Sequence, residues 1–278
     1  MKNTKGETYE VSLDFRKTVS ENAEKAYEDN KKIKNKLDGA KISITKTKEL
    51  IKSAEKQEIQ KEKEKTSDKK EKIYWFEKYR WFISSAGNIV IGGRDAKTND
   101  LIVKKYLKED DRYAHADIHG APSIIIKNKG IKDEKIQITE ETLEEACIFA
   151  ASFSKAWKQF AEAQAYWVSP EQVSKTAQSG EFVPKGGFII RGKRNYYRCK
   201  LEVAVGEINL DDEKKIMSGP VSAVKKNSQK YVILVPGDTK RNVIAHRLAK
   251  AFNVSVDSVD RVLPPGDVTI SGNVGVDL

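Results

Sequence analysis

The stretch "RYAHADIHGAPSIIIK", residues 112–127, decides the fold of the globular part of the chain. Residues 112–118 alternate between apolar and polar side chains, which is typical of a half-buried strand. Gly120, Ala121 and Pro122 then form a turn, and residues 123–127 make a short buried strand. The stretch therefore predicts two strands joined by a turn.

The segment upstream predicts a β-hairpin followed by a helix. Residues 73–85 are rich in aromatic side chains, and the apolar run IVIGG follows the turn residues 86–88. Two such segments around a glycine turn are typical of a hairpin. Asp95 is placed to cap the N-terminus of a helix over 96–108, because a carboxylate there accepts backbone N–H groups.

The segment downstream is predicted to contain blocks of short strands with only a few helices. Apolar residues three and four apart predict a helix over 140–163, with Thr142 and Glu145 as its capping box. Another helix is predicted over 239–252, before a Gly/Pro-rich tail. Short strands are predicted at 165–168, 187–190, 201–205 and 231–235. This order favours an α+β fold, a mixed or antiparallel sheet with packed helices, over a doubly wound sheet.

The N-terminal part has a different pattern, a heptad seam. From Val19 to Ala54, apolar or small residues fall alternately four and three apart, which predicts a long coiled-coil helix of roughly 54 Å. Gly39 costs about 1 kcal/mol inside a helix, so a helical hairpin that turns at Asp38–Gly39 is the alternative. The unbroken phase of the seam favours one helix. A single helix cannot bury this seam, so a second helix is expected, from another copy or from a segment outside this sequence.

Composition divides the chain at the end of this helix. The tract 60–72 has no apolar residue, and the composition changes sharply at Ile73, where an aromatic-rich segment begins. We therefore expect a coiled-coil arm and charged linker over 1–72 and a globular domain over 73–278. Cys147 and Cys199 form no CxxC pair, which argues against a disulfide framework or a Cys-rich zinc module.

Charge points to a polyanionic partner. The net charge of the 278 residues is +10, with 33% charged residues. Clustered lysine and arginine attract phosphates, whereas an ordinary solvated basic surface is the alternative. No secretion signal or apolar run of membrane-spanning length occurs in the sequence, so the cytoplasm is the expected location. The densest basic block, residues 175–200, has Glu181 as its acidic residue and contains Lys175, Lys185, Arg191, Lys193, Arg194, Arg198 and Lys200.

The histidines of residues 115–119 raise the question of a metal site. His115, Asp117 and His119 would share one face of a strand, but the outer pair would be about 13 Å apart along the backbone. Ligands of one ion must converge, so a straight strand cannot present all three. A metal-dependent nuclease or hydrolase that uses His115 and Asp117 stays an alternative. The favoured interpretation is a set of structural or ligand-contacting polar residues, with no metal or other cofactor.

The stretch "PKGGFIIRGKRNYYR", residues 184–198, contains residue types that are suited to binding nucleic acid. Gly186 and Gly187 let a backbone approach a ligand, and the arginines and lysines can pair with phosphates. Tyr196 and Tyr197 could stack on unpaired bases, although strand alternation lets only one of them face the basic surface. A plain hairpin with Gly192 in its turn is the alternative. Since the sequence has no nucleophile elbow, HExxH or P-loop motif, we do not expect an enzyme.

Long segments of the chain resemble a known family. RWFISSAGNIVIGGRDAKTNDLIVKKYL, YAHADIHGAPSIIIKN, YWVSPEQVSKTAQSGEFVPKGGFIIRGKRNYY and YVILVPGD, which together cover about 73–240, are similar to the NFACT-R domain of the NEMF and RqcH family in its archaeal form. VSENAEKAYEDNKKIKNKLDGAK resembles the start of that family's coiled-coil arm. Some homologues carry the label fibronectin-binding protein.

The resemblance implies a role in ribosome-associated quality control. Family members bind large ribosomal subunits and tRNA, and NFACT-R is regarded as an RNA-binding module. The family's N-terminal domain and helix-hairpin-helix region have no counterpart in this sequence, so tail synthesis by this chain alone is not expected. A coiled-coil scaffold without RNA contact is the main alternative. The expected RNA-contacting residues are Arg94, Lys175, Lys185, Arg191, Lys193, Arg194, Tyr196, Tyr197 and Arg198, beside a polar pocket of Asp95, His115, Asp117 and His119.

Overall fold

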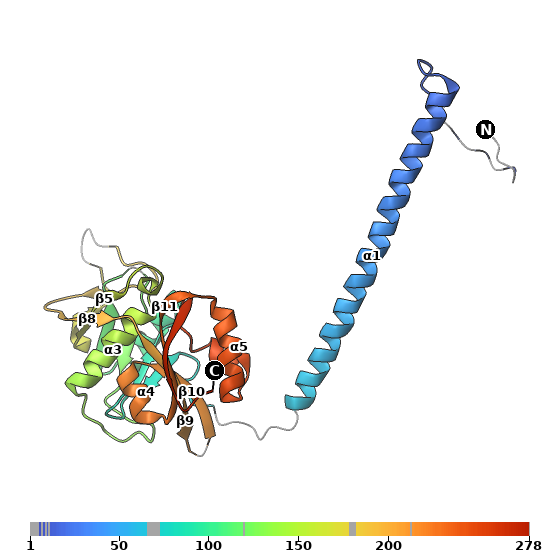
Figure 1. Ribbon diagram of the computed structural model, residues 1–278. Coiled ribbons are helices and arrows are strands. Elements are labelled where there is room, and N and C mark those ends of the chain that lie inside the picture. The colour runs from blue at the N-terminus through green and yellow to red at the C-terminus, as the bar shows by residue number, and fades with distance from the viewer. Residues whose placement is uncertain are drawn as a thin grey trace. The chain divides into compact units, whose positions relative to one another are not determined.

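The computed structural model describes residues 6, 8, 10, 12–65, 73–118, 120–177, 182–211 and 213–277. The chain divides into two compact units, residues 1–71 and 72–278. The first contains helix α1 (Val19–Lys65) and the second contains all the described sheets (Figure 1). No described helix is both long and apolar enough to cross a membrane.

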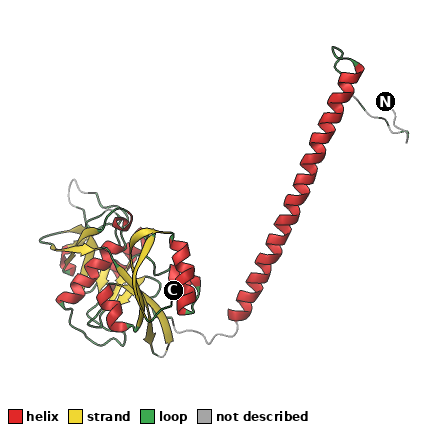
Figure 2. Cartoon of the chain, in the orientation of Figure 1, coloured by secondary structure: helices red, strands yellow, loops and turns green. Residues whose placement is uncertain are grey.

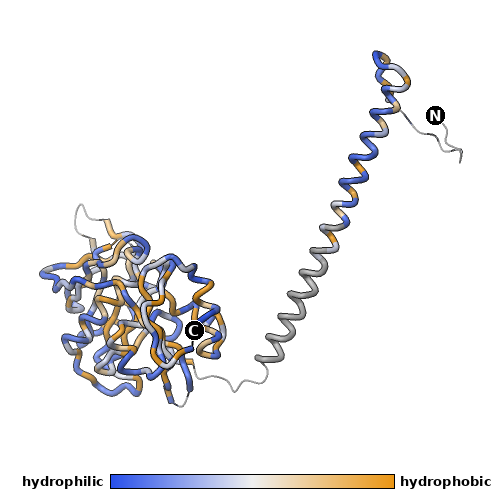
Figure 3. The backbone as a smooth tube through the Cα atoms, viewed as in Figure 1, coloured by the Kyte–Doolittle hydropathy of each residue, from blue (hydrophilic) through white to orange (hydrophobic). Residues whose placement is uncertain are grey.

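Helix α1 is continuous through Gly39, so the single helix is confirmed and the hairpin alternative is wrong. The backbone N–H of Thr18 donates to the Glu21 carboxylate at 2.7 Å, and the Glu21 N–H donates to the Thr18 hydroxyl at 3.3 Å. This reciprocal pair caps the N-terminus. Figure 3 shows the described turns as mostly hydrophilic with apolar residues at intervals, and the seam residues Ile33, Leu37 and Ile44 are exposed. Pairing of this seam stays a prediction.

Figure 2 shows the strands of the second unit surrounded by helices and loops. The main sheet of this unit has six antiparallel strands in the order β1-β2-β4-β3-β5-β8. The predicted hairpin and the strand-turn-strand unit are confirmed. Because β3 pairs with β4 on one side and β5 on the other, it ties the hairpin to the later strands. The strands are β1 (Arg80–Ile83), β2 (Ile89–Gly92), β3 (Arg112–Ala116), β4 (Ile124–Ile126), β5 (Glu162–Val168) and β8 (Asn195–Lys200).

Two helices flank this sheet. Asp95 caps α2 (Ala96–Tyr106) by accepting the Thr98 N–H at 2.8 Å, as predicted. Helix α3 (Glu140–Ser152) is shorter than the predicted 140–163, because the Ser154 hydroxyl donates to the Ala151 carbonyl and caps a separate 3₁₀ turn, η1 (Lys155–Lys158). Another 3₁₀ turn, η2 (Pro170–Gln172), follows β5.

The predicted capping box of α3 is wrong. Thr139 is the N-cap, and its hydroxyl accepts the Thr142 N–H at 3.2 Å. Glu145 is buried instead: its carboxylate accepts the Ser85 N–H at 3.0 Å and the Ser222 hydroxyl at 2.7 Å. Glu145 therefore joins α3 to two segments that lie far away in the sequence.

A second, four-stranded antiparallel sheet has the order β10-β9-β11-β12. The predicted tail contains β12, so the tail prediction was wrong. The α+β class is confirmed by these two sheets and their helices. The elements are β9 (Val203–Leu210), β10 (Glu213–Gly219), α4 (Val221–Asn227), β11 (Lys230–Thr239), α5 (Arg241–Phe252), α6 (Val256–Asp260) and β12 (Val268–Val274).

A two-stranded sheet contradicts the alternative of a plain hairpin within residues 184–198. β7 (Ile189–Ile190) pairs with β6 (Val173–Ser174), whereas β8 pairs with β5 at the edge of the main sheet. Gly192 has a φ of +85° and lies at a bend between β7 and β8. The chain thus leaves one sheet at β7 and enters another at β8.

One apolar core extends across both large sheets. Phe82 of β1 packs on Phe149 of α3 with ring centroids 4.8 Å apart, and a Cβ at Gly219 of β10 would lie 2.9 Å from the Phe82 Cβ. A smaller cluster of Tyr113, Tyr166 and Val168 lies apart from this core. It is covered by Val103 of α2, Leu107 at the end of that helix, Val173 of β6 and Ile190 of β7.

Replacing Glu145 by Gln tests the buried carboxylate. Burial raises the pKa of Glu145 above its usual value, so the folded state holds this proton more tightly than the unfolded state, and stability falls as pH rises through the folded pKa. Glutamine keeps an acceptor for the Ser85 N–H. We expect E145Q to equal or exceed the wild type in free energy of unfolding at about pH 8, with a smaller difference at about pH 5. Urea denaturation of both proteins at both pH values measures this difference in the free energy of unfolding.

The matched control is Glu144→Gln, since Glu144 is exposed on the same helix. A stability loss in E145Q at the higher pH, absent from E144Q, would mean that the ionised carboxylate stabilises the fold.

Candidate nucleic-acid interface

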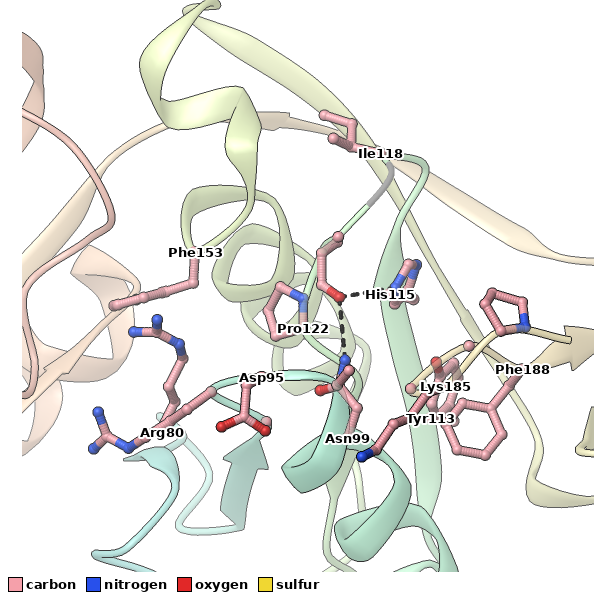
Figure 4. Close-up of a pocket in the computed structure, with 18 of the residues that line it drawn as sticks. Arg80, Asp95, Asn99, Tyr113, His115, Ile118, Pro122, Phe153, Lys185 and Phe188 are labelled. Atoms are coloured by element: carbon pink, nitrogen blue, oxygen red, sulfur yellow. Dashed lines mark hydrogen bonds between the residues drawn. The ribbon is translucent and has the colours of Figure 1, made fainter.

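A cavity of about 430 Å³ lies between the N-terminal end of α2, the turn before β4 and the loop 184–188 (Figure 4). Its floor is the face of the main sheet that carries Tyr113, His115 and Tyr166. Because side chains alternate along β3, this face is opposite the one whose Ala114 and Ala116 join the main core. Of the predicted site residues, Arg94, Asp95, His115 and Lys185 line the cavity.

The loop 184–188 is fastened to α2. Gly186 has a φ of +77°, and a Cβ there would lie 2.5 Å from the Ala96 Cα. The Gly186 N–H donates to the Asp100 carboxylate at 3.1 Å. Lys175 donates to the same carboxylate at 2.6 Å and to the Gly187 carbonyl at 2.8 Å. Lys175, a predicted phosphate contact, therefore holds the cavity wall.

The turn before β4 is fixed by polar side chains. His115 Nε2 donates to the Ala121 carbonyl at 3.1 Å, and Asn99 accepts the Ser123 N–H at 3.0 Å. Burial lowers the pKa of His115, so the ring is neutral near pH 7. The Tyr113 hydroxyl and Ser123 Oγ are 3.0 Å apart. His119 lies outside the described residues.

A row of rings crosses the edge of the sheet from β3 to β8. His115, Tyr166 and Tyr196 are register neighbours, with ring centroids 6.2 and 5.5 Å apart. Arg194 lies over Tyr166 at 4.7 Å and donates to the Tyr196 hydroxyl at 3.2 Å, and its ion pair with Asp117 measures 3.8 Å. Tyr196 is 48% exposed.

Tyr197 lies on the other face of β8. Its hydroxyl donates to the Glu140 carboxylate at the start of α3, and its ring packs against the main core. Only Tyr196 of the pair is therefore presented to a ligand on the outer face. Asp117 lies next to this face but does not line the cavity.

Several of the predicted phosphate contacts already form hydrogen bonds or ion pairs within the protein. The Arg94 guanidinium donates to the carbonyls of Lys78, Tyr79 and Arg261, which makes it a structural residue. Arg191 donates to the Thr176 carbonyl at 3.3 Å, and Arg198 pairs with Glu162 at 2.5 Å.

Lys185 and Lys193 are the exposed cations of this region that are available to a ligand. Neither ammonium group has a hydrogen bond or ion pair with another described residue. The Asp100 carboxylate interacts electrostatically with Lys185. An anion can still approach either ammonium group without first breaking an ion pair with a described residue.

Arg80 is a cavity residue that sequence reasoning missed. Its guanidinium lies over the Phe153 ring at 4.7 Å, and burial together with the charges of Arg94 and Arg241 lowers its pKa to about 10. Within the sequence it looks like the first residue of an ordinary strand. Only the fold brings Phe153 and Arg241 beside it, so no local signal could have identified it.

A metal site has no support in the geometry. Across the described residues, a set that leaves out His119, no three His, Cys, Asp or Glu side chains are grouped to hold an ion. His115 Nε2 is occupied by the Ala121 carbonyl, and Asp117 faces Arg194. No observation therefore favours the nuclease or hydrolase alternative.

Comparison with known proteins identifies the class of the globular unit. Residues 78–192 match the family described as NFACT protein RNA binding domain. This part of the chain is an NFACT-R domain, as the resemblance predicted. The chain belongs to the family of the RqcH, NEMF and Rqc2 proteins.

Three relatives illustrate this similarity. The archaeal Rqc2 homolog aRqcH of Methanocaldococcus jannaschii is 43% identical over 201 residues, which is 70% of this chain and 29% of that protein. The human ribosome quality control complex subunit NEMF is 43% identical over 176 residues, 62% of this chain and 16% of that protein. Ribosome quality control complex subunit 2 of Schizosaccharomyces pombe is 38% identical over 196 residues, 67% and 18% of the two chains.

The chain thus spans less than a third of the length of these relatives. Among solved structures, the C-terminal part of the fibronectin/fibrinogen-binding protein from Streptococcus suis matches 49% of each chain, at 20% identity and a TM-score of 0.36. A similarity this low supports no conclusion about fold or function.

Replacing Gly186 by Ala tests how the cavity wall is held. A side chain at this positive φ costs roughly 1–2 kcal/mol, and its Cβ would also meet the Ala96 backbone. We expect a lower free energy of unfolding and faster tryptic cleavage at Lys185. The control is Gly187→Ala, whose Cβ would come no nearer than 3.1 Å to its closest neighbour, Pro184. Equal behaviour of G186A and G187A would contradict the packing described for this loop.

Proposed function

We propose that the globular unit binds single-stranded or looped RNA. We call the surface formed by Lys185, Lys193, Arg194 and Tyr196 the basic face. The observation that carries the proposal is the exposed Tyr196, whose hydroxyl accepts a hydrogen bond from Arg194, together with the exposed lysines Lys185 and Lys193, which form no ion pair with a described residue. Cations attract phosphates, and an exposed ring stacks on an unpaired base. The NFACT-R match supports the same conclusion.

We further propose that this RNA belongs to the ribosome or to tRNA. The relatives named as ribosome quality control subunits support a factor of that process, and the large ribosomal subunit is its expected docking site. In this proposal the chain acts by binding, not as an enzyme, and works in the cytoplasm. The exposed seam of α1 would pair with a second helix, and a second copy of the chain can supply it.

A coiled-coil scaffold without RNA contact is the second candidate, supported by the same exposed seam. Ribosome co-sedimentation with and without residues 1–72 separates the two. Binding that survives removal of the arm supports the RNA-binding domain. Binding that is lost only with the arm supports the scaffold.

The double variant Lys185→Met and Lys193→Met tests the basic face directly. Removing two phosphate contacts should lower the slope of log K against log salt by about 1.4 for single-stranded RNA. Affinity should fall by roughly tenfold or more at low salt. Fluorescence anisotropy at several salt concentrations measures both, with a single-stranded oligoribonucleotide and with tRNA.

The matched control is Lys225→Met with Lys226→Met, which removes the same charge from exposed positions of α4. A salt slope and affinity that change equally in both double variants would mean that only net charge matters. In that case the basic face is not the RNA site.

A further inference from the structure

Arg80 forms one end of the cavity. Among the described residues, the Arg80 guanidinium has no hydrogen bond or ion pair; its contact is the face of the Phe153 ring at 4.7 Å. The side chain is only partly accessible, at the edge of the cavity. Removing a guanidinium from water without an acceptor is costly, so this end is arranged for an anion.

The neighbouring charges strengthen this preference. Arg94 and Arg241 both act on Arg80, but their own donors are used, Arg94 on carbonyls and Arg241 on Asp260 at 2.6 Å. Asp95 is the one acidic side chain among the described residues that line the cavity. It is exposed and accepts the Thr98 N–H as a helix cap, so its charge is partly satisfied. Arg80 thus keeps unused donors in a region of positive potential.

The opposite end of the cavity is walled by rings. Figure 4 shows Arg80 and Phe153 on one side, and Tyr113, His115 and Phe188 on the other, with Lys185 at this second side. The Tyr113 and Phe188 ring centroids are 6.3 Å apart, and the neutral His115 ring is parallel to Tyr113 within 7°. A ligand of matching chemistry carries an anionic group at one end and a flat ring at the other.

The cavity is also continuous with the basic face. Tyr166 lines the cavity and packs edge-on against Tyr196, and Lys185 belongs to both surfaces. Its volume of about 430 Å³ lies within the range of roughly 300–1,000 Å³ typical of small-ligand sites. Gly93, Gly120 and Gly187 place backbone without side chains along its wall.

From these observations we propose that the cavity binds one unstacked nucleotide of the bound RNA. Its phosphate pairs with Arg80 and its base packs against the end of the cavity lined by Tyr113, His115 and Phe188. The inference rests on the proposed RNA binding, which it deepens by assigning a pocket for a single nucleotide. Unpaired nucleotides can leave the stack at low cost, and aromatic walls then replace the lost stacking.

The test uses the full chain and three kinds of probe: the four nucleoside 5′-monophosphates, the corresponding nucleosides and inorganic phosphate. NMR of the arginine Nε–H groups reports on Arg80, whose signal is assigned by its absence in Arg80→Met. We expect a nucleoside monophosphate to shift this signal, and both the nucleoside and inorganic phosphate to bind at least roughly tenfold more weakly.

Arg80→Met removes the charge and keeps a long apolar stem against Phe153. We expect R80M to weaken monophosphate binding by roughly tenfold or more and to lower the RNA salt slope by about 0.7, as one lost phosphate contact predicts. Arg247→Met, at an exposed position of α5, is the control and should change neither. Should R80M fail to fold, Phe188→Leu tests the ring end: it should weaken the nucleotide and leave inorganic phosphate unchanged.

Two results would overturn the nucleotide pocket. The first is an Arg80 NMR signal that no nucleoside monophosphate shifts. The second is inorganic phosphate that binds as tightly as the nucleotide, which would mean an anion site without base recognition. If either occurs while the lysine double variant loses RNA affinity, the pocket is wrong and the proposed function stands. Monophosphate binding at Arg80 in a chain that binds no RNA would refute the proposed function alone.

Discussion

The pairing of β3 between β4 and β5 is the constraint on which the rest of the globular unit depends. Strand alternation sends Ala114 and Ala116 to the face covered by α3, where small side chains let the helix approach, and it sends Tyr113 and His115 to the other face. A shift of one residue in this register would exchange the two sets. It would bury the polar histidine against the helix and remove the floor of the cavity.

The position of the site depends on which part of that second face of the sheet is covered by other elements. Residues of α2, β6 and β7 close over Val168 and its neighbours, whereas the N-terminal end of α2 and the loop 184–188 leave a cavity beside them. Lys175 and Arg94 donate hydrogen bonds to backbone carbonyls and so hold these walls in place. Among the described residues, Arg80 and Lys185 line this cavity without a hydrogen bond or ion pair of their own, and the exposed Lys193 lies shortly before β8. These cations are available to an RNA strand.

Much of the fold could be predicted from local sequence patterns. The glycine turn at 86–88, the Asp95 cap and the apolar run at 124–126 were predictable because each depends on its own neighbours in the chain. β12 was missed because its glycines and polar residues match no strand pattern. The pairing of β7 with β6 was not predicted, because the register between distant strands leaves no local signal in the sequence. The site was predictable as a basic region, but the division between structural and available cations depends on carbonyl groups, such as those of Lys78 and Arg261, that only the tertiary fold brings close.

The central claim is that RNA contacts the sheet face bounded by the cavity and β8. Ultraviolet cross-linking of the full chain to a single-stranded RNA, followed by mass spectrometry of the cross-linked peptides, tests it most directly because it assumes no particular contact residue. The account predicts cross-links at Tyr196 and within residues 182–194, and at Phe188 in particular. Cross-links confined to α1, α4 or α5, with none on this face, would contradict it.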